Sequence, residues 1–544
     1  MIADISITEK SFGPKTLMKN IKFSIDDSEK VGVIGRNGVG KSTLFGILAG
    51  TDKDFTGEVI YKRGTTVVAT EQEYHGVGEQ TVLQYVLAGL PEYAALSHII
   101  ETYPLTMGDD MDKINEYTDA LGRFDDKGFY QIEEQIEREL DNFQLVGIAH
   151  RSFASLSGGQ KRLVEVVKVM HSDAHLALVD EPTNHMDYVA KQQFIDWMKD
   201  AREAMLVITH DRDVLAHVDR IVELKDGGSQ SFKGNYDAYL KQNAHSTGTA
   251  MNEFELIEKR ITNLKVKVVD YRRLKEKSRN PQTIQKFKRL EEVSRKELMD
   301  LQAKEKPTFW IDKESVENLN YKVAGQYDKF KAKNIRMDLK NDESRSKHVL
   351  VASRGLSLGY DAPLFGGIDI DLREGEALEI RGRNGAGKST LIKSLLGSKE
   401  ATMFGGELTL DTHVRIGVYE QEVSPTYFDM TLELAIERVY LDRNLSISET
   451  KIRQLMSDYL FNDGDRQVPV SKLSGGQKAR LQVIQMLAND PQLLILDEPT
   501  NHLDLPSIEE LETALKRYSG AILYVSHDDY FRRAIGGDVQ VLQQ

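Results

Sequence analysis

The chain has 544 residues, 40% of them hydrophobic and 29% charged, which is the composition of a folded protein rather than a disordered one. No run approaches the ~18 to 20 apolar residues that cross a bilayer, the N-terminus lacks an apolar signal core, and no cysteine is present for a disulfide or a thiolate metal site. We therefore expect a soluble, cytoplasmic protein of several domains, and the net charge of −14 argues against a surface covered by nucleic acid.

A glycine-rich segment at residues 35–42 is the first feature that carries chemistry. It follows the apolar, strand-like run Val31 to Ile34 and precedes a helical pattern, which is the context of a phosphate-binding P-loop. Its glycines let backbone N–H groups turn toward phosphates at a helix N-terminus, where the helix dipole favours anions. We predict that Lys41 binds the β- and γ-phosphates of ATP and that the Ser42 hydroxyl binds Mg²⁺. The ATP-binding residues predicted here are Gly35, Asn37, Gly38, Gly40, Lys41, Ser42 and Thr43.

Two acidic residues end an apolar run later in the same half. Leu176 to Val179 is followed by Asp180 and Glu181, a pattern typical of a buried parallel strand that delivers carboxylates to the edge where α/β folds bind ligands. We predict that Asp180 holds Mg²⁺ through water and that Glu181 orients or deprotonates the attacking water, because phosphoryl transfer depends on positioning. Such a pair alone could be a helix cap or a solvated turn.

The C-terminal half repeats the N-terminal half. Residues 35–42 return at 382–389, and the segments at 156–160 and 180–185 return 317 positions later. The repetition argues against a purely structural role for the glycine-rich turn, and against a helix cap or a solvated turn for the acidic pair. The repeated ATP-binding residues are Gly382, Asn384, Gly385, Gly387, Lys388, Ser389 and Thr390, with Ser389 and Asp497 predicted for Mg²⁺ and Glu498 for the attacking water.

The first half carries an acidic insertion. The offset between the copies is 349 at Gln72 and 317 at Leu156, which places 32 additional residues between them. From Glu92 to Gly128, nine acidic residues stand against three basic ones, a net charge of −6. We expect a helical insertion at about residues 90–128, and its charge argues against RNA contact. The insertion could contact a basic ribosomal protein, or it could be a solvated helical extension without a partner.

The connector between the halves is predicted to form a helical hairpin. From about Asn252 to Lys306 the apolar residues recur at helical spacing, and Asn280-Pro281 in the middle favours a tight reversal between two helices of roughly 28 residues. A single helix kinked at the proline is the alternative. Residues 259–289 contain twelve basic and two acidic residues, a net charge of +10, which is what contact with a phosphate backbone requires.

Leu-Ser-Gly-Gly-Gln, at residues 156–160 and again at 473–477, resembles the signature sequence of ATP-binding cassette proteins. The resemblance implies two cassettes that close head to tail, so that the signature of each contacts the nucleotide on the P-loop of the other. It also implies a Q-loop glutamine that couples Mg²⁺ to motion, a switch histidine that takes part in catalysis, and an aromatic residue that stacks on adenine. The matching residues are Ser157, Gly158, Gly159, Ser474, Gly475 and Gly476 for the signatures, Gln72 and Gln421, also placed at the metal, for the Q-loops, His210 and His527 for the switch, and Phe12 and Tyr360 for adenine.

Asp-Glu-Pro-Thr-Asn-His in both halves, together with the charged connector, resembles the ABC-F branch of that family. The branch implies a translation factor whose connector reaches ribosomal RNA and the peptidyl-site tRNA. The predicted RNA-binding residues are Arg272, Arg273, Lys275, Lys277, Arg279, Lys286, Lys288 and Arg289. A ribosome-protection protein that confers antibiotic resistance is the nearest alternative, although those tend to have a longer connector tip. A transporter ATPase subunit and a DNA-binding repair ATPase are alternatives from other classes.

The expected architecture follows from these features. We predict an α/β fold with two tandem P-loop ATP-binding cassettes, each a mixed sheet with a helical subdomain, joined by a helical hairpin. The predicted boundaries are residues 1–243 for the first cassette, 244–345 for the linker and 346–544 for the second cassette. ATP and Mg²⁺ are the expected cofactors. We expect a monomer whose two cassettes pair within the chain, and no membrane partner.

Overall fold

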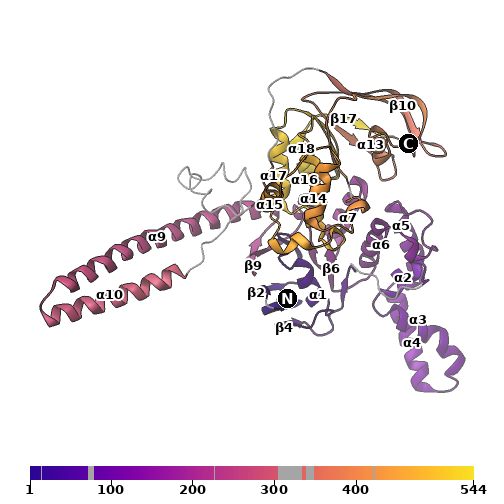
Figure 1. Ribbon diagram of the computed structural model, residues 1–544. Coiled ribbons are helices and arrows are strands. Elements are labelled where there is room, and N and C mark those ends of the chain that lie inside the picture. The colour runs from indigo at the N-terminus through magenta and orange to yellow at the C-terminus, as the bar shows by residue number, and fades with distance from the viewer. Residues whose placement is uncertain are drawn as a thin grey trace. The chain divides into compact units, whose positions relative to one another are not determined.

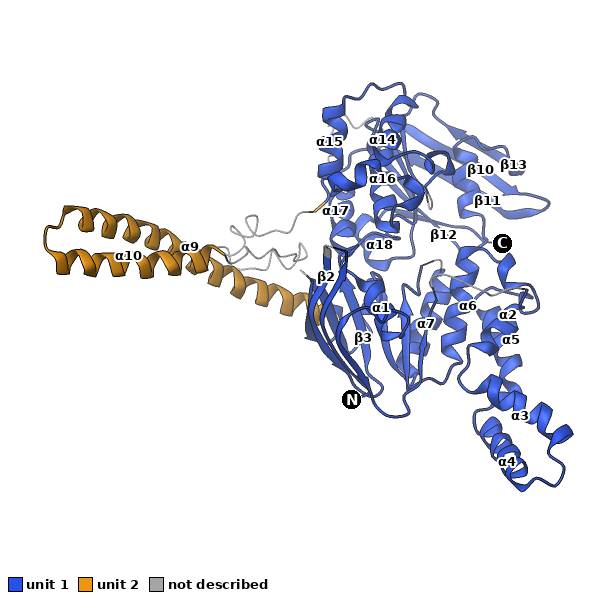
Figure 2. Cartoon of the chain, turned by 60° about the horizontal axis from the view of Figure 1, so that its bottom comes forward, with its two compact units in different colours: residues 1–236, 335–544 blue, residues 237–334 orange. Residues whose placement is uncertain are grey.

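The computed structural model describes residues 1–13, 15–71, 79–184, 186–225, 227–303, 334–337, 348–420 and 423–543. These form two compact units, one of residues 1–236 and 335–544 and the other of residues 237–334 (Figure 2). The larger unit contains the predicted second cassette and the predicted first cassette as far as residue 236. The predicted Q-loop residues Gln72 and Gln421 lie outside the described residues.

The first cassette is built on a six-stranded sheet with the order β5-β6-β7-β3-β8-β9. The first five strands in this order pair in parallel with their neighbours. The edge strand β9 pairs antiparallel with β8. A separate antiparallel sheet has the order β2-β1-β4. The strands are β1 (Ala3–Phe12), β2 (Lys15–Ile25), β3 (Lys30–Gly35), β4 (Thr56–Tyr61), β5 (Val67–Ala69), β6 (Leu176–Asp180), β7 (Ala204–Ile208), β8 (Arg220–Lys225) and β9 (Gly228–Lys233). Every residue of β6 and β7 is buried, as expected of parallel strands covered on both faces.

The helices of the first cassette divide between those that cover the sheet and those that form the helical subdomain. They are α1 (Lys41–Leu48), α2 (Val82–Ala88), α3 (Tyr93–Thr106), α4 (Met111–Asp126), α5 (Ile132–Asn142), α6 (Gly158–Met170), α7 (Tyr188–Asp200) and α8 (Arg212–Leu215), with short 3₁₀ turns at Phe129–Gln131 and Phe153–Ser155. One hydrophobic core joins α2, α5 and α6 to β6 and β7, and a second joins α1 to the strands β1 to β3. The P-loop, which precedes α1, and the signature, which begins α6, therefore pack against different hydrophobic cores of the same cassette.

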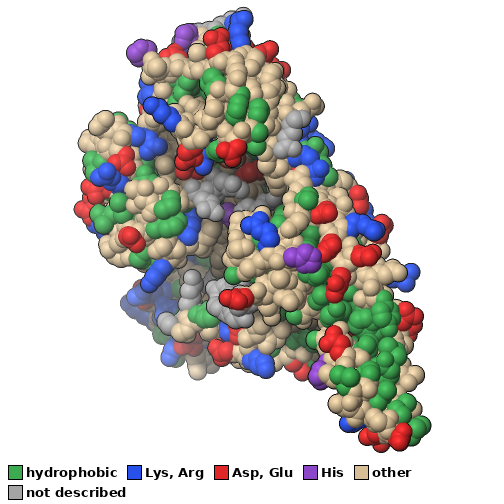
Figure 3. Space-filling view, turned by 90° about the vertical axis from the view of Figure 1, so that its right-hand side faces the viewer, with side chains coloured by type: hydrophobic (Ala, Val, Ile, Leu, Met, Phe, Trp, Pro, Cys, Tyr) green, Lys and Arg blue, Asp and Glu red, His purple; other side chains and the backbone are tan. Residues whose placement is uncertain are grey.

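The predicted acidic insertion forms the antiparallel helix pair α3 and α4, which projects from the cassette as an arm (Figure 1). Asp110 caps α4 by accepting hydrogen bonds from the N–H groups of Asp112 and Lys113. Arg123 returns to the base of the arm through a 2.6 Å ion pair with Glu92. Hydrophobic side chains gather on the arm in the view of Figure 3. Leu105 of α3 is 86% exposed.

The second cassette repeats the same design. Its parallel sheet has the order β14-β15-β16-β12-β17, and its antiparallel sheet has the order β11-β10-β13. The strands are β10 (Val349–Gly359), β11 (Pro363–Arg373), β12 (Ala377–Arg381), β13 (Thr402–Leu410), β14 (Ile416–Tyr419), β15 (Leu493–Asp497), β16 (Ala521–Val525) and β17 (Asp538–Val541). The helices are α13 (Lys388–Leu395), α14 (Leu432–Leu441), α15 (Glu449–Asp458), α16 (Gly475–Leu487), α17 (Leu505–Lys516) and α18 (Asp529–Ile535), with 3₁₀ turns at Pro425–Tyr427, Asp463–Gln467 and Val470–Lys472. The predicted fold class, two tandem mixed α/β cassettes with helical subdomains, is confirmed.

The smaller unit contains the predicted hairpin. Helix α9 (Tyr236–Lys277) ends just before Asn280, which caps α10 (Pro281–Gln302) by accepting a hydrogen bond from the Gln282 N–H. Contacts between the helices show that they run antiparallel: Tyr271 stacks on Phe287, Lys275 pairs with Glu291, and Arg260 pairs with Glu297. The reversal at Asn280-Pro281 is confirmed and the kinked single helix is wrong.

The predicted start of the first hairpin helix is also wrong. Helix α9 begins at Tyr236, sixteen residues before Asn252. The segment from Ser246 to Thr249 contains weak helix formers without an apolar stripe, so local propensity gave no helix signal. In the structure, Ser246 and Thr249 donate their hydroxyl hydrogen bonds to helix carbonyls three and four residues earlier, and Thr247 is buried.

Candidate functional site

The two P-loops hold their lysines in the same way. Lys41 is the first residue of α1 and donates to the carbonyl oxygens of Gly35 at 2.7 Å and Arg36 at 3.2 Å. Lys388, the first residue of α13, donates to the corresponding oxygens of Gly382 and Arg383 at 2.7 and 3.1 Å. Burial lowers the pKa of both ammonium groups. Each amine is therefore a desolvated cation enclosed by a helix N-terminus, which suits an anionic ligand.

A glycine is required immediately before each lysine. Gly40 and Gly387 cap α1 and α13 in the left-handed region, with φ values of 107° and 91°. A Cβ atom at Gly40 would lie 2.6 Å from the Met18 Cε, and one at Gly387 would lie 2.8 Å from the Phe365 ring. The backbone conformation disfavours other residues at both positions, and at Gly387 the Phe365 ring also leaves too little space for a Cβ atom. The glycine pattern of the P-loop thus has a structural cause in this chain.

The P-loop serine and the first acid of each pair lie close together. Ser42 Oγ is 3.4 Å from Asp180 Oδ2, and Ser389 Oγ donates to Asp497 Oδ2 at 2.9 Å. The strands β6 and β15 end at these aspartates, and the helices α1 and α13 begin beside the serines. A hydroxyl and a carboxylate are oxygen ligands of the kind that Mg²⁺ prefers beside phosphates. The donor set therefore fits the predicted ion, which when bound would offset the charge of the phosphate oxygens.

The second acid of each pair is held in a strained backbone conformation. Glu181 and Glu498 have φ values of 47° and 51°, in the left-handed region that non-glycine residues rarely occupy. Such conformations concentrate at functional sites, where the surrounding structure enforces them. Burial raises the pKa of Glu181 to about 8, helped by Asp180, and burial raises that of Glu498 to about 7. A carboxyl group with a pKa near neutrality is suited to accept a proton from water.

The predicted switch histidines face these glutamates. The His210 backbone N–H donates to Glu181 Oε2 at 3.4 Å, and the His527 N–H donates to Glu498 Oε2 at 3.2 Å. Nε2 of each ring lies near the other carboxylate oxygen, at 3.6 Å for His210 and 3.2 Å for His527. Burial, followed by the nearby P-loop lysine, depresses the pKa of both rings, to about 3 for His527. Both imidazoles are therefore neutral at physiological pH.

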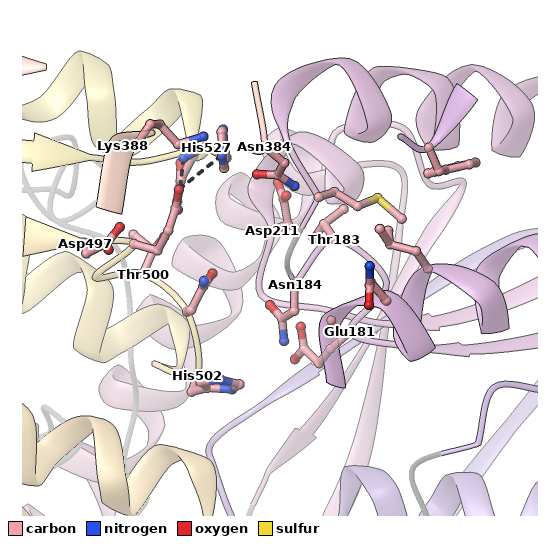
Figure 4. Close-up of a pocket in the computed structure, with 18 of the residues that line it drawn as sticks. Glu181, Thr183, Asn184, Asp211, Asn384, Lys388, Asp497, Thr500, His502 and His527 are labelled. Atoms are coloured by element: carbon pink, nitrogen blue, oxygen red, sulfur yellow. Dashed lines mark hydrogen bonds and ion pairs between the residues drawn. The ribbon is translucent and has the colours of Figure 1, made fainter. Parts of the chain in front are cut away.

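A cavity of about 420 Å³ joins the second P-loop to the first signature. One side is formed by Lys388, Ser389, Asp497 and Glu498 of the second cassette. The other side carries residues of the first cassette, Ser157, Gly159, Gln160, Glu181, Thr183, Asn184 and His210. In Figure 4, Lys388, Asp497 and His527 lie across the cavity from Glu181 and Thr183. The cavity thus brings Ser157 and Gly159 of the first signature together with the second P-loop, residues that the sequence assigns to one composite site, and it also includes Glu181 and His210 of the first cassette.

The first P-loop meets the second cassette in the same manner. The Asn37 amide donates from Nδ2 to the His502 carbonyl oxygen at 2.8 Å, and a Cβ atom at Gly476 would lie 3.1 Å from the Asn37 Cβ. The signature residues Ser157 and Ser474 cap α6 and α16 in a reciprocal hydrogen-bond pair with Gln160 and Gln477. Each signature glycine pair therefore lies at a helix N-terminus.

Sequence reasoning missed two aspartates that join the cassettes. Asp187 caps α7 with one oxygen and with the other accepts from the Asn384 N–H at 3.1 Å and from Arg383 Nε at 3.3 Å. Asp504 caps α17 and accepts from the Asn37 N–H at 3.2 Å. Burial would raise the pKa of Asp187, but these hydrogen bonds and Arg383 hold it below its usual value. Their recurrence 317 positions apart was the signal that could have found them.

The predicted adenine-stacking residues are both accessible. Phe12 is 57% exposed and ends β1, and Tyr360 is 49% exposed and follows β10. The Tyr360 hydroxyl lies 3.5 Å from Thr390 Oγ1, which places that ring beside the second P-loop helix. The Lys10 ammonium lies 4.9 Å from the centre of the Phe12 ring. Adenine stacking is a prediction for both residues.

The segment that precedes each Q-loop is anchored to the signature helix. In the first cassette the fully buried Glu165 of α6 accepts from the Glu71 N–H at 2.7 Å, from the Tyr85 hydroxyl and from Lys168 at 2.8 Å. In the second cassette Gln482 of α16 makes the equivalent tie by donating to the Glu420 carbonyl oxygen at 2.6 Å. The anchoring side chain is thus a carboxylate, Glu165, in the first cassette and a neutral amide, Gln482, in the second.

Substituting leucine at these two positions is expected to have unequal effects. Glu165→Leu leaves the buried Lys168 without its main partner and should lower the free energy of unfolding by about 3–5 kcal/mol. Gln482→Leu removes one neutral amide and should cost about 1–3 kcal/mol. Denaturant unfolding monitored by circular dichroism compares them. Equal losses would show that the ionic partner of Lys168 carries no special stability.

The comparisons with known proteins identify the family. The family described as "ABC transporter" matches residues 18–184 and 365–501, together more than half of the chain. ABC transporter F family member 5 of Arabidopsis thaliana is 28% identical, with 97% of this chain and 72% of that protein covered. The energy-dependent translational throttle protein EttA of Mycobacterium tuberculosis is 28% identical, with 96% and 88% covered. The ribosome protection protein VmlR of Bacillus subtilis is 27% identical, with 97% and 84% covered.

A solved structure supports the fold. It is the complex of an archaeal ribosome recycling factor, aABCE1, with a ribosomal stalk protein, matched with a TM-score of 0.58 and 16% identity over 98% of this chain and 87% of that one. In the part of the chain that the structure describes, no helix is long and apolar enough to span a membrane. With its two cassettes and the relatives above, the chain is an ATP hydrolase that belongs to the ABC-F family of ATP-binding cassette proteins.

Proposed function

We propose that this ATPase is a translation factor that acts on the ribosome. ATP binds at two composite sites, each formed by the P-loop of one cassette and the signature of the other, with Mg²⁺ held by Ser42 and Asp180 or by Ser389 and Asp497. Glu181 and Glu498 orient and deprotonate the attacking water, and the neutral switch histidines hold these glutamates in position. The contacts of the described site residues and the relatives EttA and VmlR support this proposal.

The charge of the hairpin is the observation that carries the ribosomal role. Residues 259–289 have a net charge of +10 in a chain of −14. Most of the predicted RNA-binding side chains are exposed. Lys275 is different, because it pairs with the buried Glu291 and so ties α9 to α10. The exposed cations are free to approach ribosomal RNA or the peptidyl-site tRNA, which is the contact we propose.

The hairpin tip favours a translation factor over a ribosome-protection protein. Only residues 278–280 separate α9 from α10, and Asn280 itself caps the second helix. Such a short tip leaves little chain to reach beyond the helices toward a bound antibiotic. A transporter ATPase subunit would have no evident use for a basic hairpin. A DNA-binding role shares the same phosphate attraction and is separated from the proposal by experiment.

A trapped variant identifies the partner. The Glu181→Gln, Glu498→Gln double variant with ATP should co-sediment with ribosomes from lysate, whereas the same variant with ADP should not. Enrichment with membranes or with DNA, and absence from the ribosomal fractions, would contradict the proposal. Treating the lysate with a DNA-specific nuclease separates DNA association, which is then lost, from ribosome association, which remains.

Neutralising the hairpin should weaken ribosome binding and reduce its salt dependence. The test variant changes four exposed residues to glutamine: Arg273, Lys277, Lys286 and Lys288. If all four contact phosphates, the slope of log affinity against log salt should fall by about 3. The matched control changes four exposed cassette residues to glutamine: Lys19, Lys22, Lys53 and Arg63. Equal slopes for the hairpin variant, the control and the wild type would exclude the hairpin from the RNA contact.

A further inference from the structure

The cassettes also meet at a buried cluster of charges beside the ATP cavity, whose lining includes Asp211, His527 and Asp528. Lys191 of α7, only 6% exposed, ion-pairs with Asp213 at 2.5 Å and Asp211 at 3.3 Å within its own cassette. Its ammonium group also donates to the backbone carbonyl oxygen of His527 in the second cassette. The side chain thus reaches across the interface to the switch histidine of the second ATP site.

A second cation of the first cassette, Arg212, binds Asp528, the residue after His527. Arg212 of α8 pairs with Asp528 at 2.9 Å and with Glu512 at 2.5 Å, both in the second cassette. The guanidinium also lies 4.9 Å from the centre of the Tyr530 ring. His527 and Asp528 are therefore held in succession by Lys191 and Arg212, two buried cations from the opposite cassette.

Only one of the two switch histidines receives such contacts from the opposite cassette. At the 317-residue offset that relates the two switch histidines, Lys191 corresponds to Ile508 and Arg212 corresponds to Asp529. Isoleucine offers no donor to the His210 carbonyl, and its side chain belongs to the hydrophobic core of the second cassette. An aspartate likewise cannot donate to Asp211 as Arg212 does to Asp528. The first ATP site is therefore built without this pair of trans cations.

The contact of Lys191 is transmitted to the second ATP site through the main chain. The His527 N–H donates to Glu498 Oε2 at 3.2 Å, and Nε2 of the ring lies 3.2 Å from Glu498 Oε1, an oxygen that is buried without a hydrogen-bond partner in the described structure. At the first site the corresponding distances to Glu181 are 3.4 and 3.6 Å, and both ring nitrogens of His210 are buried without a hydrogen-bond partner in the described structure. The switch histidine that receives the amine from the other cassette therefore lies nearer to its glutamate than the other switch histidine does.

We propose that Lys191 is a positioning residue that the first cassette supplies to the second ATP site alone, holding His527 and thereby Glu498 in place. The inference rests on the two composite ATP sites proposed above. It has two consequences. The two sites hydrolyse ATP unequally, and turnover at the second site depends on an amine that reaches it only while the cassettes are in contact.

The test measures the two sites separately in the full chain. A photoreactive ATP analogue is trapped with vanadate during turnover, and labelled peptides are assigned to residues 1–243 or 346–544. Lys191→Met should lower label in the second region about tenfold at saturating nucleotide, the effect of losing one charged hydrogen bond, and leave the first region within about twofold. The apparent affinity for the analogue should be unchanged in both regions.

Three further variants distinguish positioning from a general loss of structure. Lys191→Met combined with Asp213→Asn neutralises the nearer of the two acids that lose the lysine, and it should show the same selective loss with a thermal stability closer to that of the wild type. Lys191→Arg retains a donor and should restore label in the second region. Lys199→Met, an exposed lysine on the same helix, should resemble the wild type.

The results separate this inference from the proposed function. Equal loss in both regions, or no loss in either, for the single and double variants would overturn the role of Lys191 while the wild type still labels both regions. Failure of the wild type to label both regions would instead contradict the two composite ATP sites themselves.

Discussion

Replacing Glu181 and Glu498 together with glutamine is expected to lower ATP turnover at least about 100-fold without loss of nucleotide binding. A positioned general base contributes roughly 10²- to 10⁴-fold, and glutamine cannot accept the proton. The substitution keeps the shape of the side chain, so both backbone conformations with positive φ should be retained. Steady-state phosphate release measures turnover, and rapid gel filtration measures retained ATP.

The control for this variant uses two exposed glutamates in equivalent strands. Glu58 and Glu407 lie in β4 and β13, on the antiparallel sheets. Changing both to glutamine removes the same two charges and should leave turnover near that of the wild type. Substantial turnover by the Glu181, Glu498 variant would show that neither glutamate acts on the attacking water.

Replacing one P-loop lysine with methionine is expected to abolish one of the two nucleotide sites. Lys41→Met and Lys388→Met each remove a buried cation that we predict to contact the phosphates, an interaction worth about 2–5 kcal/mol. The dissociation constant of the affected site should rise about 100-fold or more. Equilibrium titration with a fluorescent ATP analogue should find two sites in the wild type and one high-affinity site in each variant.

A lysine on the same helix provides the comparison. Lys393 of α13 is exposed and has Glu400 as an ion-pair partner at 3.8 Å, so Lys393→Met should retain two sites. Two high-affinity sites in Lys41→Met or in Lys388→Met would show that the lysine concerned does not bind the phosphates.

The local features of the cassettes could be predicted because their causes are local. A strand, a glycine-rich turn and a helix N-terminus follow one another within the P-loop, so spacing alone places Lys41 and Lys388. Likewise, fully apolar runs predict the buried strands that end at Asp180 and Asp497. The hairpin reversal was readable because proline restricts the residue before it and suits the first turn of α10.

The ionic contacts of Lys191 and Arg212 between the cassettes could not be predicted from spacing. Lys191 and His527 are 336 positions apart, and nothing in the sequence around Lys191 distinguishes a buried interfacial lysine from a solvated one. The same holds for Arg212, whose partners lie 300 and 316 positions away. The early start of α9 was missed for a different reason, since tertiary burial of residues such as Tyr239 and Met251 overrides a poor local helix propensity.

The central claim is that the cassettes pair head to tail, so that each ATP lies between the P-loop of one and the signature of the other. The chain has no native cysteine, which allows a clean cross-linking test with the pair Asn37→Cys and Gly476→Cys. Oxidation should join these two cysteines within one chain, faster with ATP than without. The control pair, Asn37→Cys with Gly159→Cys, places both thiols in the first cassette and should not cross-link. A link from position 37 to 159, or none to 476 under either condition, would contradict the account.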